Sequence, residues 1–238
     1  ELIMSLPVLS TPKYQLEQPS TGEKITYRPF LVKEQKVIMM AQEANDSKLM
    51  MDSIGEIIKT CTFGKISRPE TLPTFDIEYM FLMIRSKSVG STIDLKVTCP
   101  DDGETQVDHK IEIDDIKVIK TEGHTNEIML TDDVGVVMRY PTINMVTGFD
   151  VETALLTKPT FELIRNSIHS VFDKENTYDE MDAVELDEFI ESMNTSQFDK
   201  MSNFFDTMPK LKHTFKVKNP KTEIESDVTL EGLQSFLE

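Results

Sequence analysis

The 238-residue sequence has no tryptophan, two cysteines and four histidines, and each shortage narrows the range of functions. Cys61 and Cys99 are too few for a disulfide framework or for a structural zinc site, which takes four ligands. Both thiols are therefore expected to be reduced, as they are in a cytosolic setting. No stretch approaches the roughly 18–20 apolar residues of a membrane span. The opening residues are too few and too acidic for a signal peptide, and Met4 is an alternative start of the natural chain.

Basic residues are scarce relative to acidic ones: 25 Lys and Arg stand against 42 Asp and Glu, which makes the formal net charge −17. A protein that binds a phosphate backbone needs a basic face to displace counterions, and no dense run of Lys or Arg is present. Direct binding of nucleic acid is therefore not expected. With 39% hydrophobic and 28% charged residues, the chain is typical of a globular protein with one large domain or two small ones.

Catalytic and cofactor-binding motifs are also missing. The sequence contains no Gly-x-Gly-x-x-Gly, no Walker loop, no Gly-x-Ser-x-Gly and no His-Glu-x-x-His, and its histidines are scattered. We therefore expect a protein that is not an enzyme, and we assign no catalytic, cofactor-binding or metal-binding residue.

Nine acidic residues crowd the segment from Asp173 to Glu191, which has the composition of a calcium loop. The register does not fit, because the sixth position counted from Asp173 is Tyr178 rather than Gly and the twelfth is Val184. We expect a solvated acidic loop that leads into a helix.

Two alternating segments flank a turn between residues 92 and 113 and predict a β-hairpin with one buried face. The turn opens with Cys99 and Pro100 and closes with Gly103, which is the skeleton of a zinc knuckle of the Cys-Pro-x-Cys-Gly kind. Asp102 occupies the position of the second thiolate.

A second turn near the end of the chain has the same skeleton. Asn219 and Pro220 replace the first Cys-Pro pair, and both cysteines are absent. We expect the two turns to lie side by side in one sheet, as a degenerate, metal-free, zinc-ribbon-like pair of hairpins. A zinc site built from Cys99, His109 and His213 is a further alternative, although three ligands fall short of the four of a closed structural site.

Hydrophobic periodicity predicts helices and strands along the whole chain. Alternating segments predict strands at 13–17, 23–27, 116–119, 127–131, 135–140, 212–218 and 223–230. Helical spacing predicts helices at 32–44, 47–62, 74–87, 161–172, 184–193, 196–208 and 230–237, with a helical turn at 150–157.

The order of these elements is typical of an α+β protein rather than of alternating βαβ units. We expect helical N- and C-terminal parts around a mostly antiparallel β module. Residues 1–90 are expected to form a hairpin and three helices, and residues 91–140 the β module. Residues 141–209 are expected to form a helical region with the acidic loop, and residues 210–238 a closing hairpin and short helix that return to the β module.

The Arg28-Pro29-Phe30 stretch ends the first hairpin and is expected to fix the start of the first helix, with Phe30 as an apolar staple. Glu34 is expected to face outward from that helix. Cys61 lies on the apolar stripe of the second helix, which predicts a buried, unreactive thiol. The third helix, with Thr74 as its expected cap, is apolar on most sides and therefore central to the core or buried in a partner.

Several of these stretches together resemble the baseplate hub and hub-assembly proteins of T4-like tailed bacteriophages. The resemblance rests on the segment 19–36 around Arg28-Pro29-Phe30, the helix end at 84–90, the strand into Cys99-Pro100 and the C-terminal segment 228–236. Relatives carry metal-type Cys-Pro-x-Cys turns at the positions of the two turns described above, and this chain departs from that pattern.

The resemblance implies a viral protein, made in the host cytoplasm, that binds other baseplate or hub proteins and takes part in building the central hub of the contractile tail. It leaves open whether the protein stays in the virion as a hub subunit or acts as an assembly factor. It also leaves open the partner, the binding face, the stoichiometry and the oligomeric state.

Two functions of other classes are alternatives. A zinc-ribbon-derived nucleic-acid or transcription accessory protein predicts bound metal and salt-dependent binding to DNA or RNA. A hydrolase that uses the acidic cluster with a divalent ion predicts activity that is lost when Asp179 or Asp182 is changed to Asn.

Overall fold

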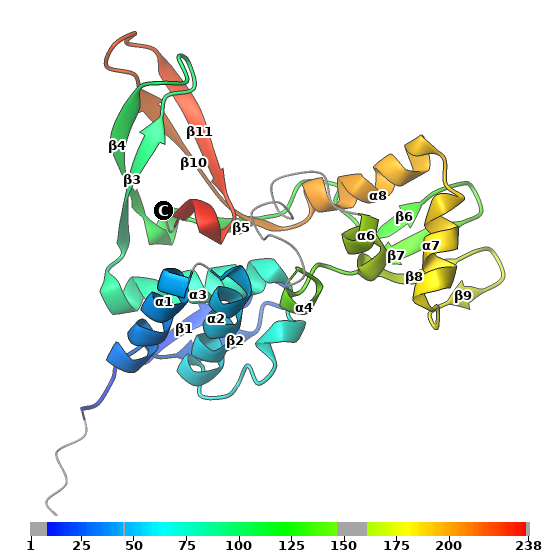
Figure 1. The fold of residues 1–238 in the computed structure, drawn as a ribbon, viewed down its shortest axis with the longest axis horizontal. Coiled ribbons are helices and arrows are strands. Elements are labelled where there is room, and N and C mark those ends of the chain that lie inside the picture. The colour runs from blue at the N-terminus through cyan, green and yellow to red at the C-terminus, as the bar shows by residue number, and fades with distance from the viewer. Residues whose placement is uncertain (1–8, 45, 147–160, 237–238) are drawn as a thin grey trace, which may run out of the picture.

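The computed structural model of the chain describes residues 9–44, 46–146 and 161–236. These residues form an α+β structure in which helices are combined with four small antiparallel sheets. Figure 1 shows a helical body (residues 9–44 and 46–91), an arm of two long hairpins that rises from it (residues 92–119 and 210–236) and a lobe to one side (residues 120–146 and 161–209). The expected helical turn at 150–157 lies outside the described residues.

The body begins with a hairpin of β1 (Tyr14–Glu17) and β2 (Lys24–Tyr27), which places Leu16 opposite Ile25. Three helices follow, and their predicted positions are confirmed: α1 (Val32–Ala44), α2 (Ser47–Cys61) and α3 (Thr74–Val89). A 3-10 turn, η1 (Pro69–Thr71), precedes α3.

The caps of these helices differ in kind. Asp46 caps α2, because its side chain accepts hydrogen bonds from the N–H groups of Lys48 and Leu49. The predicted cap of α3 is wrong: Thr74 lies inside the first turn, and Pro73 occupies the N-cap position without a side-chain hydrogen bond. Proline suits this position because the first N–H groups of a helix have no intrahelical acceptor.

The arm consists of two hairpins that stack face to face. The first is formed by β3 (Thr92–Thr98) and β4 (Gln106–Glu112), and the second by β10 (Lys210–Lys218) and β11 (Glu225–Glu231). A short strand, β5 (Lys117–Ile119), pairs with β10, and the 3-10 turns η2 (Ile113–Asp115) and η3 (Leu233–Phe236) close the base of the arm.

The prediction of one sheet for both turns is wrong, because β3–β4 and β11–β10–β5 are separate sheets. Each hairpin has one apolar face, and both faces are covered when the hairpins stack.

The lobe contains a four-stranded sheet in the order β6–β7–β8–β9. Its elements are β6 (Glu127–Met129), β7 (Gly135–Met138), α4 (Ile143–Val146), α6 (Phe161–Ser167), β8 (Ile168–Phe172), β9 (Thr177–Tyr178), α7 (Ala183–Glu191) and α8 (Thr195–Thr207). The prediction of one helix over 161–172 is wrong, because α6 ends at Ser167 and β8 begins at Ile168. The strands expected as one β module over 91–140 are divided among three sheets, because β6 and β7 pair within the lobe.

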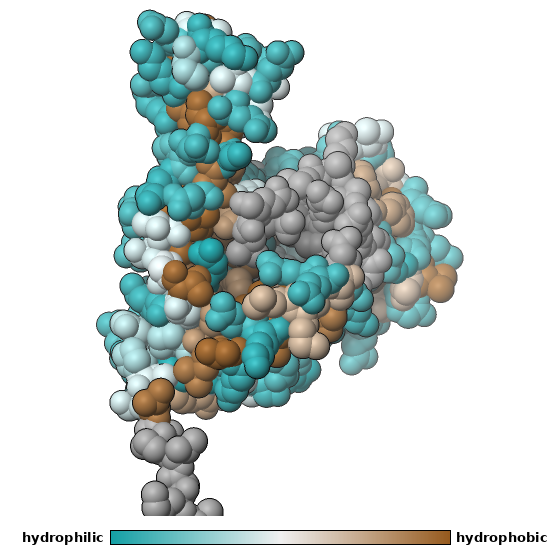
Figure 2. Space-filling view, turned by 60° about the vertical axis from the view of Figure 1, so that its left-hand side comes forward, coloured by the Kyte–Doolittle hydropathy of each residue, from teal (hydrophilic) through white to brown (hydrophobic). Residues whose placement is uncertain are grey.

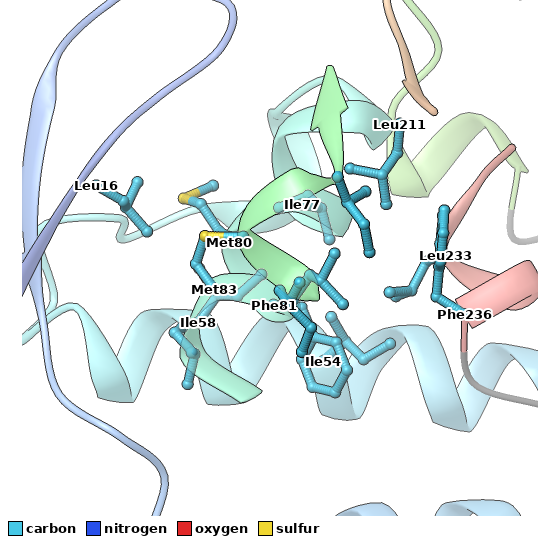
Figure 3. Packing of buried hydrophobic residues seen from close by; sticks show 14 of the residues in the cluster. Leu16, Ile54, Ile58, Ile77, Met80, Phe81, Met83, Leu211, Leu233 and Phe236 are labelled. Atoms are coloured by element: carbon cyan, nitrogen blue, oxygen red, sulfur yellow. The ribbon is translucent and has the colours of Figure 1, made fainter. Parts of the chain in front are cut away.

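Two hydrophobic clusters organise the molecule. The first joins the body to the arm, and Figure 3 shows Leu211, Leu233 and Phe236 of the arm beside Ile77 and Phe81 of α3. The second lies within the lobe, between its sheet and helices α6 to α8. Because β5 pairs with β10, the chain leaves the arm and returns to it at neighbouring strands, and the lobe is inserted between them.

Candidate protein-contact surface and arm tip

The Arg28-Pro29-Phe30 stretch anchors the start of α1 in the body. The Arg28 guanidinium lies 2.9 Å from a carboxylate oxygen of Glu34 and 2.8 Å from the Pro29 carbonyl oxygen, to which it donates. The N–H of Phe30 donates to the Ser88 hydroxyl at 2.9 Å, which ties the same stretch to the end of α3. All three residues of the stretch are buried.

Glu34 is the member of this anchor that sequence reasoning missed. It was expected to face outward, but it is buried, and its carboxylate also accepts the N–H of Leu31 at 2.7 Å. Burial acts to raise the pKa of Glu34, but the hydrogen bonds from Arg28 and Leu31 outweigh it and lower the pKa below its usual 4.5. The signal in the sequence was a glutamate at the third position of the helix, which in a capping box bonds back to the N-cap N–H.

The outward side of α1 exposes several large apolar side chains. Only Glu34 and Ala41 of this helix are buried, whereas Val32 and Met40 are each 67% exposed and Met39 is 52% exposed. We define the α1 apolar face as the exposed large apolar residues between 31 and 49: Leu31, Val32, Val37, Met39, Met40 and Leu49. Figure 2, which turns the arm side of the molecule toward the viewer, shows hydrophobic patches on the body below a hydrophilic arm tip. Such exposed apolar patches are typical of surfaces that contact other proteins.

The first turn at the arm tip has the backbone hydrogen bonds of a knuckle. The N–H of Gly103 donates to the Cys99 carbonyl at 2.9 Å, and the N–H of Cys99 donates to the Thr105 carbonyl at 2.7 Å. Gly103 has a φ of 68°, a left-handed conformation that glycine adopts without strain. Pro100, which follows Cys99, lies exposed at the surface of the turn.

The second turn repeats this arrangement. The N–H of Glu223 donates to the Asn219 carbonyl, and the N–H of Asn219 donates to the Ile224 carbonyl, both at 2.9 Å. Glu223 has a φ of 61° at the position that corresponds to Gly103. Pro220 is exposed like Pro100, and Asn219 is buried like Cys99.

Side-chain hydrogen bonds join the two turns although 117 or more residues separate them in the sequence. The Asn219 amide donates to Asp101 at 3.0 and 3.1 Å and to Asp102 at 2.9 Å, and the Thr222 hydroxyl donates to Asp101. The structure therefore brings together all five candidate residues of the two turns, with Asp101, Asp102 and Thr222 as the partners that carry the contact.

The carboxylates of this junction are charged. The Thr222 hydroxyl, with the Asn219 amide, holds the pKa of Asp101 below 3.8, and the Thr105 hydroxyl and N–H hold that of Asp102 far below the same value. Burial raises the pKa of the nearby Cys99 thiol, and the two carboxylates raise it further. Cys99 is therefore a protonated, buried thiol, which favours packing over reaction.

The other sequence candidates have structural partners of their own. Asp173 accepts hydrogen bonds from the N–H groups of Glu175 and Asn176, and Asp182 forms a capping box with Glu185 at the start of α7. His109 and His213 both stack on Phe215 between the two hairpins, with ring centroids 4.1 and 5.6 Å from it.

In residues 9–44, 46–146 and 161–236, no group of three or more His, Cys, Asp or Glu side chains is arranged to hold a metal ion. Over the same residues, every helix is too short or too polar to cross a membrane.

An α+β chain with an anchored apolar helix face and a projecting arm has the features of a protein that is built to contact other proteins. A sequence model of the family described as T4 bacteriophage base plate protein matches residues 11–238, nearly the whole chain. The chain belongs to this family and is a bacteriophage baseplate protein, a component of the phage tail. The resemblance to T4-like baseplate proteins is thereby confirmed, and other phage proteins are the partners that the family implies. No curated protein and no solved structure gives a significant match.

Proposed function

We propose that this baseplate protein takes part in assembling the central hub of the baseplate, as a hub subunit or as an assembly factor. Its role is binding without catalysis, it needs no cofactor, and its partners are other baseplate or hub proteins. It is made in the host cytoplasm, and as a hub subunit it stays in the virion.

The observation that carries this proposal is the α1 apolar face. Transferring such a surface from water to a protein interface is favourable by roughly 25 cal/mol for each Å² of apolar area. Its methionines, Met39 and Met40, are flexible and adapt to the shape of a partner. Lys33 and Lys36 are exposed on the same helix, so the surface combines apolar and basic side chains.

The anchor under α1 supports the same role. A helix that buries only two of its residues gains little from packing. The buried ion pair of Arg28 with Glu34 holds the start of α1 in place, so that the apolar face is presented in a fixed orientation. A pre-ordered surface loses less conformational entropy on binding.

We further propose that the arm tip is a metal-free counterpart of a zinc ribbon. Two turns with the same backbone skeleton face each other, and the amide of Asn219 bonds to Asp101 and Asp102 where a ribbon would hold a metal. In this proposal, hydrogen bonds between the turns take over the cross-linking that thiolates and zinc provide in relatives.

The test of the hub proposal is co-expression of the chain with the other tail proteins of the phage. Size-exclusion chromatography with light scattering identifies the complexes and their stoichiometry, and metal analysis is made on the same peaks. We expect a metal-free complex with a hub protein. The double variant Met39→Lys/Met40→Lys should weaken it at least about tenfold, because central apolar contacts contribute most to affinity.

Val184→Lys is the matched control, because Val184 is 65% exposed but lies on α7 in the lobe. It places a lysine at an exposed apolar position away from α1 and should leave the complex intact. A lone peak that contains one zinc per chain would reject the hub proposal and favour the zinc-ribbon accessory protein. Equal weakening by both variants would reject the α1 apolar face as the contact.

A further inference from the structure

The arm contains a second candidate contact surface, the free edge of β3, which is separate from the α1 apolar face. β3 pairs with β4 alone, so within the described chain its other edge has no neighbouring strand. This edge lies in a groove of about 940 Å³, whose lining includes five consecutive residues of β3, 94–98. Val228 and Leu230 of β11, with Ser235 of η3, also line the groove.

The pairing register shows which main-chain groups of β3 face β4. The N–H of Ile113 donates to the Ser91 carbonyl, and the N–H of Cys99 donates to the Thr105 carbonyl, each at 2.7 Å. Hydrogen-bonded and non-hydrogen-bonded residue pairs alternate along an antiparallel ladder. The odd-numbered residues of β3 therefore use their main-chain groups to bind β4.

The even-numbered residues of β3 direct their main-chain N–H and C=O groups away from β4, toward the free edge. Asp94, Lys96 and Thr98 each have an N–H and a C=O there, and no backbone partner for them is found among the residues that the structure describes. With about 3.3 Å per residue, the five residues that line the groove span roughly 17 Å. A row of unpaired donors and acceptors of this length is a template for one more strand.

The floor of the groove is apolar. Leu95 and Val97 are buried at 7% exposure each, and Val228 and Leu230 are half-buried. An added strand places alternate side chains on the same face as Leu95 and Val97, because side chains alternate along a strand. Alternate residues of the occupant are therefore apolar.

The groove lining and the adjoining arm tip differ in net charge. The groove lining contains two acids, Asp94 and Asp108, and two bases, Lys96 and Lys110, and Lys110 lies 3.4 Å from Asp94. The adjoining arm tip is acidic. Its two turns, 99–105 and 219–224, contain four exposed acids and one exposed base: Asp101, Asp102, Glu104, Glu223 and Lys221. A neutral segment with a basic residue beside the tip complements this pattern.

We infer that the edge of β3 binds an extended segment of another baseplate protein, which adds a third strand to the β3–β4 sheet. The segment has apolar residues at alternate positions and a basic residue at the end next to the arm tip. This inference rests on the proposed function for the identity of the partner, and it adds the mode of binding.

The experiment uses the full-length, isotope-labelled chain and overlapping synthetic peptides that cover the other baseplate proteins of the same phage. Hydrogen exchange is followed by NMR at each amide of β3. In the free chain, the amides of Asp94, Lys96 and Thr98 should exchange fast and those of Leu95 and Val97 slowly. A binding peptide should protect the three fast amides, so that the alternation disappears.

Lys96→Pro removes one edge N–H without touching the ladder to β4, and Lys96→Ala removes the same charge but keeps that N–H. Loss of one hydrogen bond should weaken binding by about tenfold for Lys96→Pro, whereas Lys96→Ala binds like the wild type. Unchanged melting temperatures of both variants confirm that the fold is intact.

Each other outcome overturns the inference in a recognisable way. A hub complex that forms while the three amides stay unprotected rejects the β3 edge and leaves the proposed function standing. Protection of these amides in the free chain, with a dimer in light scattering, identifies a second copy as the occupant and rejects a foreign strand. If no complex and no peptide binding is found, the proposed function and the inference are both rejected.

Discussion

The two hydrophobic clusters of this protein are assembled from very different parts of the chain. The cluster of the body and arm has members from Leu16 near the N-terminus to Phe236 near the C-terminus. The buried members of the lobe cluster lie between Leu130 and Met208. Non-local contacts must overcome the entropy of closing long loops, and local contacts need not. We therefore expect the lobe to depend less on the two ends of the chain than the body and arm do.

Specific contacts among the described residues connect the two clusters, and α4 contributes Ile143 to the first and Met145 to the second. Phe75 of α3 packs edge-on against Tyr140 with ring centroids 5.2 Å apart, and the N–H of Thr74 donates to the Pro141 carbonyl at 2.9 Å. At the other side, the N–H of Thr121 donates to the Thr207 carbonyl, next to the pairing of β5 with β10. We expect the lobe to open without the body, and the following variants test this.

The largest predicted effect separates the clusters directly. Phe81→Ala in α3 and Phe204→Ala in α8 each remove a side chain that is 2% exposed, and each should cost about 3–5 kcal/mol. Phe204→Ala should speed hydrogen exchange in the lobe alone, because Phe204 packs on His124, Tyr140 and Phe205. Phe81→Ala should speed exchange in body and arm together. Uniform acceleration over the whole chain by both variants would show that the clusters unfold as one.

A smaller effect, confined to the first cluster, depends on pH. Burial raises the pKa of Glu78 from 4.5 to about 7, and the hydrogen bond from the Leu233 N–H only partly opposes this. The folded state therefore favours the protonated acid, and stability is full below pH 4.5 and falls as the pH rises to about 7. One unit of pKa difference corresponds to roughly 1.4 kcal/mol, so the free energy of unfolding should fall by about 3 kcal/mol over this pH range.

Glu78→Gln should remove this loss, because the amide keeps the shape of the protonated acid. Urea unfolding of the body and arm at pH 5.5 and pH 8 measures the change in the free energy of unfolding. The buried Asp76 also has a raised pKa, through burial that its bonds to Ser20 and Gln18 only partly offset, so a slope of the same sign remains. A slope that is identical in wild type and Glu78→Gln would show that Glu78 is charged in the folded state.

For the body and arm, sequence patterns predicted the helices and strands better than the contacts between them. Sequence patterns place α1, α2 and α3 correctly: apolar residues recur at helical spacing in α1 and α2, and Pro73 and Gly90 bound the long apolar run of α3. The burial of Glu34 was missed because it depends on Arg28, which lies outside the helix. The exposure of the α1 apolar face was missed because periodicity shows which residues share a face but not what covers it.

In the lobe the errors concern the elements themselves. Ile168, Val171 and Phe172 have a spacing that fits a helix, yet they form β8, where pairing with β7 decides the conformation. β9 has two residues, too few for any period. At the candidate site, the repeated turn skeleton predicted that the two tips face each other. It could not predict that the two hairpins form separate, stacked sheets, because that arrangement depends on which apolar faces of the hairpins are buried against each other.

The smallest predicted effect concerns the arm tip, which extends beyond the first hydrophobic cluster. Asn219→Ala removes the buried amide that links the two turns, and it should lower the melting temperature of the body and arm by roughly 2–4 °C. The lobe should melt as before. Lys221→Ala is the matched control, because Lys221 is an exposed residue of the same turn and the described chain shows no side-chain hydrogen bond or ion pair from it. If the two variants melt alike, the arm tip is held by the stacked faces below it. A loss confined to Asn219→Ala shows instead that hydrogen bonds between the turns hold the tip, which is the role that metal-free knuckles require.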